Sequence, residues 1–305
     1  MAINDRKKEL IRCLKAEYER LKSDKNDLLL MIAEAELPEM VYNSNAIENS
    51  SLTLDDTAKI IMEQPLKTAV SVREIFEAKN LSRVIKFLWQ NPHYELSVKN
   101  IEHLHGLLLT NINDNFAGRL RQKGEYVRVG THIAPPPELV GTMLDTLIYD
   151  YLGDDLTYFV EKIARFHLEF EYIHPFCDGN GRMGRVLINQ QLANYGYPPV
   201  IIQNSGKRKE YYPYFAEYQK NRKQNDFDSH LALALIESLH KRIAYLKGNE
   251  IVTLSQYAKG QNRSLTTLLN SAKRQTIPAF RLQQTWNIGQ EIKILKYLTA
   301  QNSKK

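Results

Sequence analysis

Apolar side chains recur at intervals of three or four residues along most of this chain, which is the spacing of amphipathic helices. The first such run covers residues 3–35, where the apolar positions stand among charged neighbours. Pro38 has no amide hydrogen for a continuing helix, so we expect it to end this helix and a short helix to follow over about 39–49. The pattern predicts a mainly α fold.

The helical spacing continues beyond Pro38 and is interrupted once. Ahead of the interruption, helices are predicted near 54–63, 71–90 and 97–111, with a hydroxyl that can cap a helix close to each start: Thr57, Ser71 and Ser97. Beyond it, helical spacing covers 138–152, 155–173, 182–195 and 208–247. The interruption, residues 117–140, alternates briefly, contains Gly124 and Gly130 and includes three prolines, which predicts a small β-hairpin.

The composition is that of a globular protein without a disulfide framework. With 305 residues, 43% hydrophobic and 25% charged, the chain can bury the core of one large domain and add a small one. Its two cysteines, Cys13 and Cys177, indicate a reducing compartment. No stretch approaches the ~18 apolar residues of a membrane-spanning helix, and the N-terminus lacks the apolar core of a secretory signal. We therefore expect no membrane contact and a cytoplasmic location.

The densest run of unusual residues is HPFCDGNGR, from His174 to Arg182, with Arg185 three positions further on. It leads from one predicted helix into the N-terminus of the next, where free amides and a partial positive charge attract phosphate. Its two glycines let the backbone approach an anion, and the two arginines share one helix face. Asp178 is the hard oxygen ligand that Mg²⁺ prefers beside phosphates, and His174 can accept a proton near neutral pH.

These residues alone predict a magnesium–polyphosphate site with a histidine base. The alternative for each part is structural: a hydrogen-bonded histidine and an ordinary Gly-Asn-Gly turn. The combination of a base, a metal ligand, two glycines and two arginines within twelve residues favours the site.

Residues 174–185, HPFCDGNGRMGR, resemble the signature of the Fic family, HPFx(D/E)GN(G/K)RxxR, at every specified position. The stretch VGTHIAPPP, 129–137, resembles the family's flap, and IEHLHGLLL and GRLR resemble the helix and turn ahead of it. The resemblance spans roughly 40–220. It implies a Fic-type helical bundle with a small β-hairpin flap, about 123–134, which clamps a target protein by strand pairing.

The resemblance implies a protein adenylyltransferase, which transfers AMP from ATP to a Ser, Thr or Tyr hydroxyl of a target protein. His174 would be the general base, and Asp178 would hold Mg²⁺ on the α- and β-phosphates. Arg182 would hold the phosphate chain and Arg185 the γ-phosphate. The anion hole would come from Gly179, Asn180 and Gly181, with further ATP contacts from Met183 and Gly184. Adenine would be contacted by Val129, Tyr212 and Gln219. For Tyr212, a tyrosine-rich helix face packed in the core is the alternative.

Residues 44–49, SNAIEN, match the family's inhibitory pattern (S/T)xxxE(G/N) at Ser44, Glu48 and Asn49. A Glu48 carboxylate facing Arg185 would neutralise the side chain meant for the γ-phosphate and take its place. Because the pattern precedes the motif, the resemblance is to the class with N-terminal autoinhibition. In relatives the same glutamate can assist removal of AMP, which leaves the direction of the reaction open. An ordinary helix glutamate is the alternative.

The C-terminal residues 250–305 carry nine Lys and Arg against two Glu, so their net charge is +7 and the other 249 residues come to −1. Two short helical patterns separated at Gly260 indicate a helix-turn-helix, and 277–288 indicates a small wing. The segment is similar to excisionase-type winged helices. Such modules bind nucleic acid or dock proteins. In the first case the phosphates would meet Lys273, Arg274 and Arg281.

The predicted organisation has three parts: an N-terminal helical region, 1–95, with the inhibitory helix at about 39–50; a Fic core with the helices that follow, 96–247; and the winged helix-turn-helix-like domain, 250–305. We expect ATP and Mg²⁺ as cofactors, a target protein along the flap and, as in many relatives, a homodimer. Two other functions remain open. One is a DNA-binding regulator that uses the Fic fold as a nucleotide sensor, and the other is a Fic enzyme that transfers another phosphate-linked group.

Overall fold

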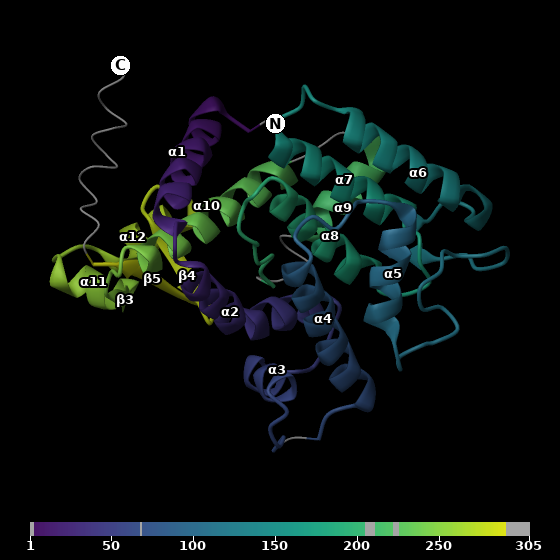
Figure 1. Ribbon diagram of the computed structural model, residues 1–305, viewed down its shortest axis with the longest axis horizontal. Coiled ribbons are helices and arrows are strands. Elements are labelled where there is room, and N and C mark those ends of the chain that lie inside the picture. The colour runs from purple at the N-terminus through teal and green to yellow at the C-terminus, as the bar shows by residue number, and fades with distance from the viewer. Residues whose placement is uncertain (1–2, 68, 205–210, 222–225, 291–305) are drawn as a thin grey trace. The chain divides into compact units, whose positions relative to one another are not determined.

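The computed structural model describes residues 3–67, 69–204, 211–221 and 226–290 (Figure 1). These residues form two compact units. The first unit covers Glu36–Leu231, and the second joins Ile3–Ala35 to the described residues from Ala232 onward. The predicted three-part division stays a prediction; the two units differ from it because the N-terminal helices are divided between them. No helix within the described residues is both long and apolar enough to cross a membrane.

The N-terminal helices break at a different place from the one predicted. Helix α1 (Asp5–Lys22) ends at Ser23, and helix α2 (Asn26–Ile47) runs through Pro38. The turn between them contains Asp24 in the left-handed region, with φ 58°, which a short polar side chain tolerates. Proline inside a helix costs about 3 kcal/mol. Here the turns after Pro38 are almost wholly buried, and that packing outweighs the lost hydrogen bond.

The first unit is helical apart from one hairpin. Its further helices are α3 (Leu54–Ile61), α4 (Val72–Gln90), α5 (Val98–Leu109), α6 (Pro137–Gly153), α7 (Phe159–Ile173), α8 (Asn180–Asn194) and α9 (Tyr212–Asn221). Ser71 and Ser97 cap α4 and α5 as predicted. The prediction for Thr57 is wrong: Thr53 caps α3 in a reciprocal bond with Asp56, and the Thr57 hydroxyl donates to the Thr53 carbonyl.

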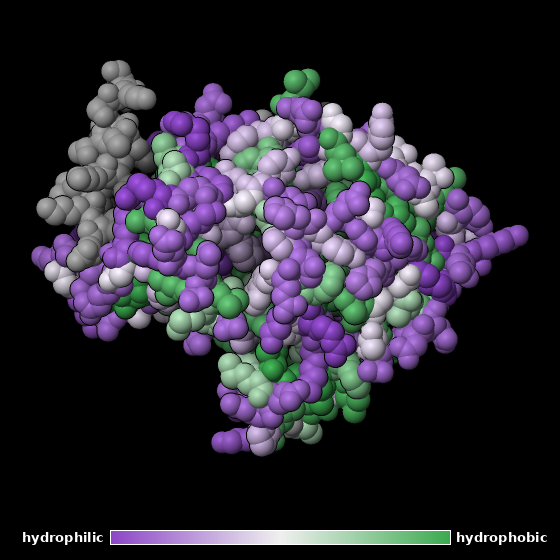
Figure 2. Space-filling model, in the orientation of Figure 1, coloured by the Kyte–Doolittle hydropathy of each residue, from purple (hydrophilic) through white to green (hydrophobic). Residues whose placement is uncertain are grey.

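The loop between α7 and α8, residues 174–179 and here called the motif loop, packs on the core of the first unit. Helix α7 packs along α8, and α4 packs against both α5 and α8 (Figure 1). Phe166 and Phe170 of α7 and Phe176 of the loop are fully buried, so aromatic packing fixes the loop to the helix before it. Apolar side chains also reach the surface along α6, where Figure 2 shows hydrophobic surface; Leu139 and Leu152 are among them.

The predicted hairpin is present. Strands β1 (Arg128–Val129) and β2 (His132–Ile133) pair antiparallel, with Val129 opposite His132. Gly130 in the connecting turn has φ 59°, a conformation that glycine adopts without strain. The side chain of His132 reaches back to the carbonyl of Tyr172, 2.9 Å away, which ties the hairpin to the end of α7.

The second unit contains a three-stranded antiparallel sheet in the order β3-β5-β4. Its elements after α10 (Phe227–Leu246) are β3 (Ile251–Thr253), α11 (Leu254–Gly260), α12 (Leu265–Lys273), β4 (Ala279–Leu282) and β5 (Thr285–Gly289). Leu254, Leu268 and Ile288 share its core. The two helices and the β4–β5 hairpin were predicted, but β3 was not, and the winged-helix assignment stays a prediction. The predicted break at Gly260 is confirmed: α11 ends at Gly260, and the turn that follows it contains Asn262 in the left-handed region, with φ 50°.

The predicted helical run over 208–247 corresponds to two helices, α9 and α10. Residues 208–210 and 222–225, on which the prediction also rests, lie outside the described residues.

Candidate active site

The motif loop is fixed at both ends by unusual backbone geometry. His174 ends α7 in the left-handed region, with φ 49° and ψ 62°, and its amide donates to the Phe170 carbonyl. Gly179, with φ 78°, directly precedes α8. The Asn180 side chain accepts from the Phe176 amide at 2.9 Å and donates to the Phe176 carbonyl at 2.8 Å. The side-chain amide of Asn180 therefore closes the loop, and the backbone N–H of Asn180 stays at the start of α8.

No side chain caps the N-terminus of α8, so its first amides are available to an anion. The glycines here are needed for space. A Cβ on Gly179 would come within 3.0 Å of Leu109, and a Cβ on Gly181 would lie within 3.2 Å of Arg185 Nη1 and collide with the Glu48 carboxylate. In the segment predicted as the anion hole, the amides of Asn180 and Gly181 are thus available and the glycines allow close approach, while the Gly179 amide donates to Asp178.

His174 has the properties of a neutral base. Its side chain is 14% exposed, and burial lowers its pKa to about 4, a shift that the Glu171 carbonyl opposes. Nδ1 lies 3.4 Å from that carbonyl, which can only accept, so Nδ1 carries the hydrogen. Nε2 is then free to take a proton at pH 7.

Asp178 lies among positive charges at the start of α8. One carboxylate oxygen pairs with Arg73 of α4, and the other accepts from the Gly179 amide at 2.6 Å and lies 3.3 Å from Arg182. Burial alone would raise its pKa, but Arg182 and Arg73 outweigh burial and lower the pKa, so the carboxylate is ionised. No group of three or more acidic, His or Cys side chains among the described residues is placed to hold a metal. A single carboxylate suits Mg²⁺ that is otherwise bound by phosphate oxygens and water.

Arg182 is buried with part of its hydrogen-bonding capacity unused. Its side chain is 3% exposed and forms ion pairs at 3.3 Å with Asp178 and with Glu77 of α4. Neither Nε nor Nη1 has a hydrogen-bond partner among the described residues, because the Glu77 contact is poorly aligned for Nη1. A polar cavity of about 310 Å³, lined by Glu48 and Arg73 among others, opens beside this side chain. Arg182 and Arg73 place positive charge along the wall of this cavity, which favours an anionic ligand there.

Arg185, one turn further along α8, has its donors occupied by the protein. Nε donates to the Ser44 hydroxyl at 2.9 Å, and Nη2 donates to the Ser44 carbonyl and to Glu48 Oε1, both at 2.8 Å. Burial alone would lower its pKa, but Tyr211 and Glu48 outweigh burial and raise it. Ser44 lies in the last turn of α2, and Glu48 directly follows the helix. Asn49 follows in the left-handed region, with φ 72°, and its amide donates to Ala46.

The two residues between these arginines face inward. Met183 is fully buried, so any contact of this residue with a nucleotide would involve its backbone. Gly184 faces α7: a Cβ at this position would lie 2.6 Å from Glu171 Oε1 and 2.7 Å from His167 Cε1.

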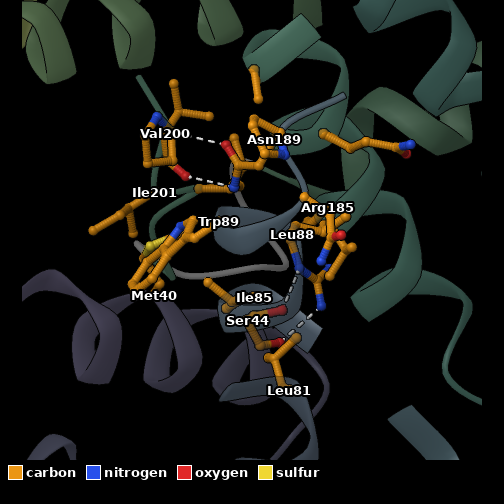
Figure 3. A pocket seen from close by; sticks show the side chains of 17 residues that line it. Met40, Ser44, Leu81, Ile85, Leu88, Trp89, Arg185, Asn189, Val200 and Ile201 are labelled. Carbon is orange, nitrogen blue, oxygen red and sulfur yellow. Dashed lines mark hydrogen bonds between the residues drawn. The ribbon is translucent and has the colours of Figure 1, made fainter. Parts of the chain in front are cut away.

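A second, apolar pocket lies behind the Arg185 contact. Figure 3 shows Arg185 and Ser44 on one side of it and Met40, Trp89 and Ile201 on the other. Its volume is about 80 Å³, and few of its lining atoms are polar. A polyphosphate would be desolvated there without partners, so the polar cavity described above fits a nucleotide phosphate chain better.

The three residues predicted to contact adenine lie on two elements, the hairpin and α9. Val129 on the hairpin and Tyr212 at the start of α9 are each 37% exposed, and Gln219 is half-buried near the end of α9. The Tyr212 hydroxyl donates to the Ile47 carbonyl at 3.2 Å. Tyr211, which was not predicted, is the fully packed tyrosine of this pair.

His105 of α5 supports the motif loop and was not predicted as a site residue. Nδ1 accepts from the Gly118 amide at 3.1 Å, so Nε2 carries the hydrogen and donates to the Asp178 carbonyl, 3.0 Å away. The ring stacks on Phe176 at 3.7 Å, and burial lowers its pKa to about 4. The only sequence signal was a histidine on the apolar face of a predicted helix.

Arg121 joins the motif loop to the hairpin and was also missed. This buried arginine donates to the carbonyls of His174 at 2.8 Å, Ile173 at 3.2 Å and Pro135 at 3.0 Å. It thus fixes the backbone of the base and the end of the hairpin segment together. In the sequence it stood within GRLR, where nothing distinguished it from a surface arginine.

In the second unit, the three residues predicted to contact phosphates differ in how accessible their charges are. Lys273 and Arg274 are exposed at the end of α12. Arg281 instead pairs with Glu237 at 2.6 Å and lies over the Trp286 ring at 4.9 Å, so a phosphate would have to compete with an internal carboxylate.

Residues 95–192, which include α5, the hairpin, α7 and most of α8, match the model of the Fic/DOC family. The chain contains a Fic/DOC family domain. Its likeness to curated proteins extends further but is distant. It is 29% identical to protein adenylyltransferase fic-1 of Caenorhabditis elegans, covering 78% of this chain and 44% of that protein. It is 30% identical to protein adenylyltransferase Fic of Nematostella vectensis, covering 70% of this chain and 53% of that protein. The chain therefore spans about half the length of these curated relatives.

Solved structures share the fold around the Fic/DOC domain. A Fic domain containing signaling protein from Bacteroides thetaiotaomicron matches with a TM-score of 0.69 and 25% identity, covering 79% of this chain and 98% of that one. Residues 134–508 of Fic-1 from C. elegans match with a TM-score of 0.66 and 26% identity, covering 79% of this chain and 73% of that one. The chain thus has the mainly helical Fic fold.

Proposed function

We propose that this chain is a protein adenylyltransferase, which transfers AMP from ATP to a Ser, Thr or Tyr hydroxyl of a target protein, and that Glu48 inhibits it. The observation that carries the proposal is Arg182, whose buried Nε and Nη1 lack partners beside Asp178 and the uncapped start of α8. A phosphate chain would complete this arrangement. The names of the relatives support ATP as the nucleotide and AMP as the transferred group.

The roles follow from the geometry of each residue. His174 Nε2 takes the proton of the target hydroxyl, the hydroxyl oxygen attacks the α-phosphorus of ATP, and pyrophosphate leaves. The lowered pKa of His174 keeps the imidazole neutral and ready at pH 7. The amides of Asn180 and Gly181 hold the α-phosphate oxygens as charge develops, while the Gly179 amide holds Asp178. Asp178 would hold Mg²⁺, which neutralises phosphate charge when bound.

The target protein is proposed to bind along the flap. The hairpin strands are two residues each, and Tyr126 ahead of β1 and Ile133 within β2 are exposed. A short exposed hairpin has unpaired edge groups to which an extended peptide can add as a further strand. Pairing there would bring a target hydroxyl toward His174, because Arg121 ties the hairpin segment to the His174 carbonyl.

Glu48 is proposed as an internal inhibitor, of the kind whose inhibitory segment precedes the motif in the chain. Its carboxylate takes up the Arg185 nitrogen that would otherwise meet the γ-phosphate. ATP can still reach Arg182 and the α8 amides, but its phosphate chain cannot extend to Arg185. The α-phosphate would then lie turned away from the attacking hydroxyl, so bound ATP would not react.

The proposal is tested with α-labelled ATP and Mg²⁺, following label on protein in the wild type and in Glu48→Gly. We expect labelling to rise on the order of 100-fold in Glu48→Gly, the ratio expected if about 99% of the wild type is in the inhibited state. Adding His174→Ala to that variant should abolish transfer while Mg-ATP still binds. Transfer that survives His174→Ala would exclude the assigned base. Incubating the labelled product with wild-type protein then measures removal of AMP.

Transfer of a different phosphate-linked group keeps the same site. ATP labelled at the γ-position and UTP labelled at the α-position distinguish phosphate and UMP transfer from AMP transfer in the same assay. A role as a mere nucleotide sensor is disfavoured by the neutral His174, because sensing does not need a base.

Nucleic-acid binding by 250–305 is a separate proposal, supported by the exposed Lys273 and Arg274. Salt-sensitive DNA binding that disappears on truncation after Gly248 would support it, and no binding by the full chain would refute it. The predicted homodimer is tested by light scattering of the full chain.

A further inference from the structure

Glu171 is a buried carboxyl beside His174 that the mechanism above does not use. It lies on α7, three residues before His174, and its side chain is 11% exposed. Oε1 is buried and has no hydrogen-bond partner among the described residues. An acid buried without a partner costs stability, since a neutral side chain of similar size would avoid the desolvation. A chemical role at the site is one reason for a chain to retain it.

The other oxygen of Glu171 faces the base. Oε2 lies 3.9 Å from His174 Nδ1, the nitrogen that carries the hydrogen. This is the side of the imidazole opposite to Nε2, so a negative charge at Glu171 would not compete for the transferred proton. It would favour a positive charge on the ring.

Helix α8 leaves room for this carboxyl at Gly184. A Cβ there would lie 2.6 Å from Glu171 Oε1, so a larger residue would push Glu171 away. Gly184 falls at a position that the signature leaves unspecified. The glycine at position 184 therefore allows α8 to pack closely against Glu171.

Glu48 restricts the charge on Glu171 in the inhibited state. Burial and then Glu48 raise the pKa of Glu171 to about 8, and Arg185 opposes this rise. At pH 7 most Glu171 carboxyls are therefore neutral while Glu48 is in place. Loss of Glu48 removes the repulsion, so Glu171 would ionise at lower pH. The other titratable groups that face it lie on α7, directly after it, or at the start of α9 and directly before it: His167, His174, Tyr212 and Tyr211.

We propose that Glu171 is a positioning residue for His174: its backbone carbonyl accepts the Nδ1 hydrogen, and its carboxylate, 3.9 Å from Nδ1, balances the charge that the ring gains during AMP transfer. In that step the hydroxyl proton moves to Nε2, the hydroxyl oxygen bonds to the α-phosphorus, and the bond from this phosphorus to the pyrophosphate oxygen breaks. Pyrophosphate leaves with that electron pair, and the imidazolium later releases its proton to water. Glu171 exchanges no proton in the step.

The inference rests on the proposed function, and its test has a readout that does not depend on it. In protein with ¹³C-labelled histidine, NMR follows the His174 ring through a pH titration, with the signal assigned by its absence in His174→Gln. The background is Glu48→Gly, which removes the repulsion that Glu48 exerts on Glu171. Glu171→Gln should lower the His174 pKa below that of the background protein, because the nearby negative charge is gone. Glu171→Asp should lower it less.

The same variants are compared in AMP transfer. Glu171→Gln should lower kcat roughly 10- to 100-fold with little change in the KM for ATP, and Glu171→Asp should restore part of the loss. The matched control is Glu169→Gln on the same helix, whose side chain contacts Tyr218 instead of the base. It should move neither the His174 pKa nor kcat.

Three results would overturn the inference: an unchanged His174 pKa in Glu171→Gln, equal losses in Glu171→Gln and Glu169→Gln, or a loss confined to KM. Should Glu171→Gln fail to fold, Glu171→Asp decides alone, because the His174 pKa must fall in it as well. If no variant transfers AMP but the His174 pKa still responds to Glu171, the proposed function fails and the pairing stands.

Discussion

Arg182 and Arg185, one turn apart on α8, differ in how far the protein satisfies their hydrogen bonds. At the Arg185 end, Ser44 and Glu48 occupy the guanidinium with three hydrogen bonds of 2.8 to 2.9 Å. At the Arg182 end, Nε and Nη1 lack partners beside a polar cavity. Both side chains are buried, so both need compensation for lost hydration. The protein supplies it at Arg185 with close hydrogen bonds, and at Arg182 with ion pairs to Asp178 and Glu77 that leave Nε and Nη1 without hydrogen bonds.

This difference suggests how a complete catalytic set can stay inactive. Under the proposed function, the half of the site around Arg182 would bind a phosphate chain, while the half around Arg185 is filled by a carboxylate from the same chain. Inhibition would then not prevent nucleotide binding but would limit how far the phosphates reach. The predictions below separate the two ends by binding, stability and pH.

Nucleotide affinity should distinguish the arginines most strongly. In the wild-type background, Arg182→Ala removes charge-assisted bonds to the phosphates and should raise the Kd of Mg-ATP about 100-fold. Arg185→Ala should change this Kd less than about threefold, since Glu48 already occupies that side chain. Isothermal titration calorimetry measures both values. Equal losses in the two variants would contradict the comparison.

Stability should respond in the reverse order. Arg185→Ala leaves the Ser44 and Glu48 acceptors without their donor and should lower the free energy of unfolding by about 2 kcal/mol. This is less than the 3–5 kcal/mol of a fully buried pair, because Glu48 is 37% exposed. Arg182→Ala should cost under about 1 kcal/mol, because Arg73 still pairs with both Asp178 and Glu77. Urea unfolding of both variants without nucleotide tests this order.

The sequence predicted the motif loop well because its chemistry is local. The chain from His174 to Arg185 lies in one loop and one helix turn, so residue types and spacing nearly define its geometry. Glu48 was expected opposite Arg185 from a short pattern, and the two side chains do lie 2.8 Å apart. Residues that act across long separations were missed. His105 reaches Asp178, and Arg121 reaches His174, through packing that no local pattern encodes.

The same limit explains the errors in the fold. Pro38 carries a strong local signal to end a helix, but the burial of the following turns decides its conformation. Thr57 lies one turn inside α3, and Thr53, which begins the Thr53–Asp56 capping box, could have been recognised from the sequence. Strand β3 has only three residues and forms by pairing with β5, far along the chain, so its own sequence gave little indication.

The smallest expected effect is on the pH dependence of stability. His105 supports the Arg182 end and has its pKa lowered to about 4 by burial, against about 6.5 in the unfolded chain. Below pH 6.5 the unfolded chain takes up this proton and the folded chain does not, so stability falls as the pH falls toward 4. The loss from this histidine between pH 6.5 and 5.5 should be about 1 kcal/mol.

His105→Gln should remove this contribution and flatten the dependence. His103→Gln, an exposed position on the same helix, should leave it unchanged. Urea unfolding at the two pH values provides the comparison. An unchanged slope in His105→Gln would mean that His105 accepts its proton in the folded protein.

The ratio of the affinities for Mg-ATP and Mg-ADP tests most directly whether Glu48 takes the place of the γ-phosphate at Arg185. The wild type should bind the two nucleotides with nearly equal Kd, because the γ-phosphate finds no free arginine. Glu48→Gly should prefer ATP by about 10-fold or more, the effect of one charge-assisted contact, and adding Arg185→Ala should abolish that preference. An equal preference for ATP in the wild type and in Glu48→Gly would contradict the account.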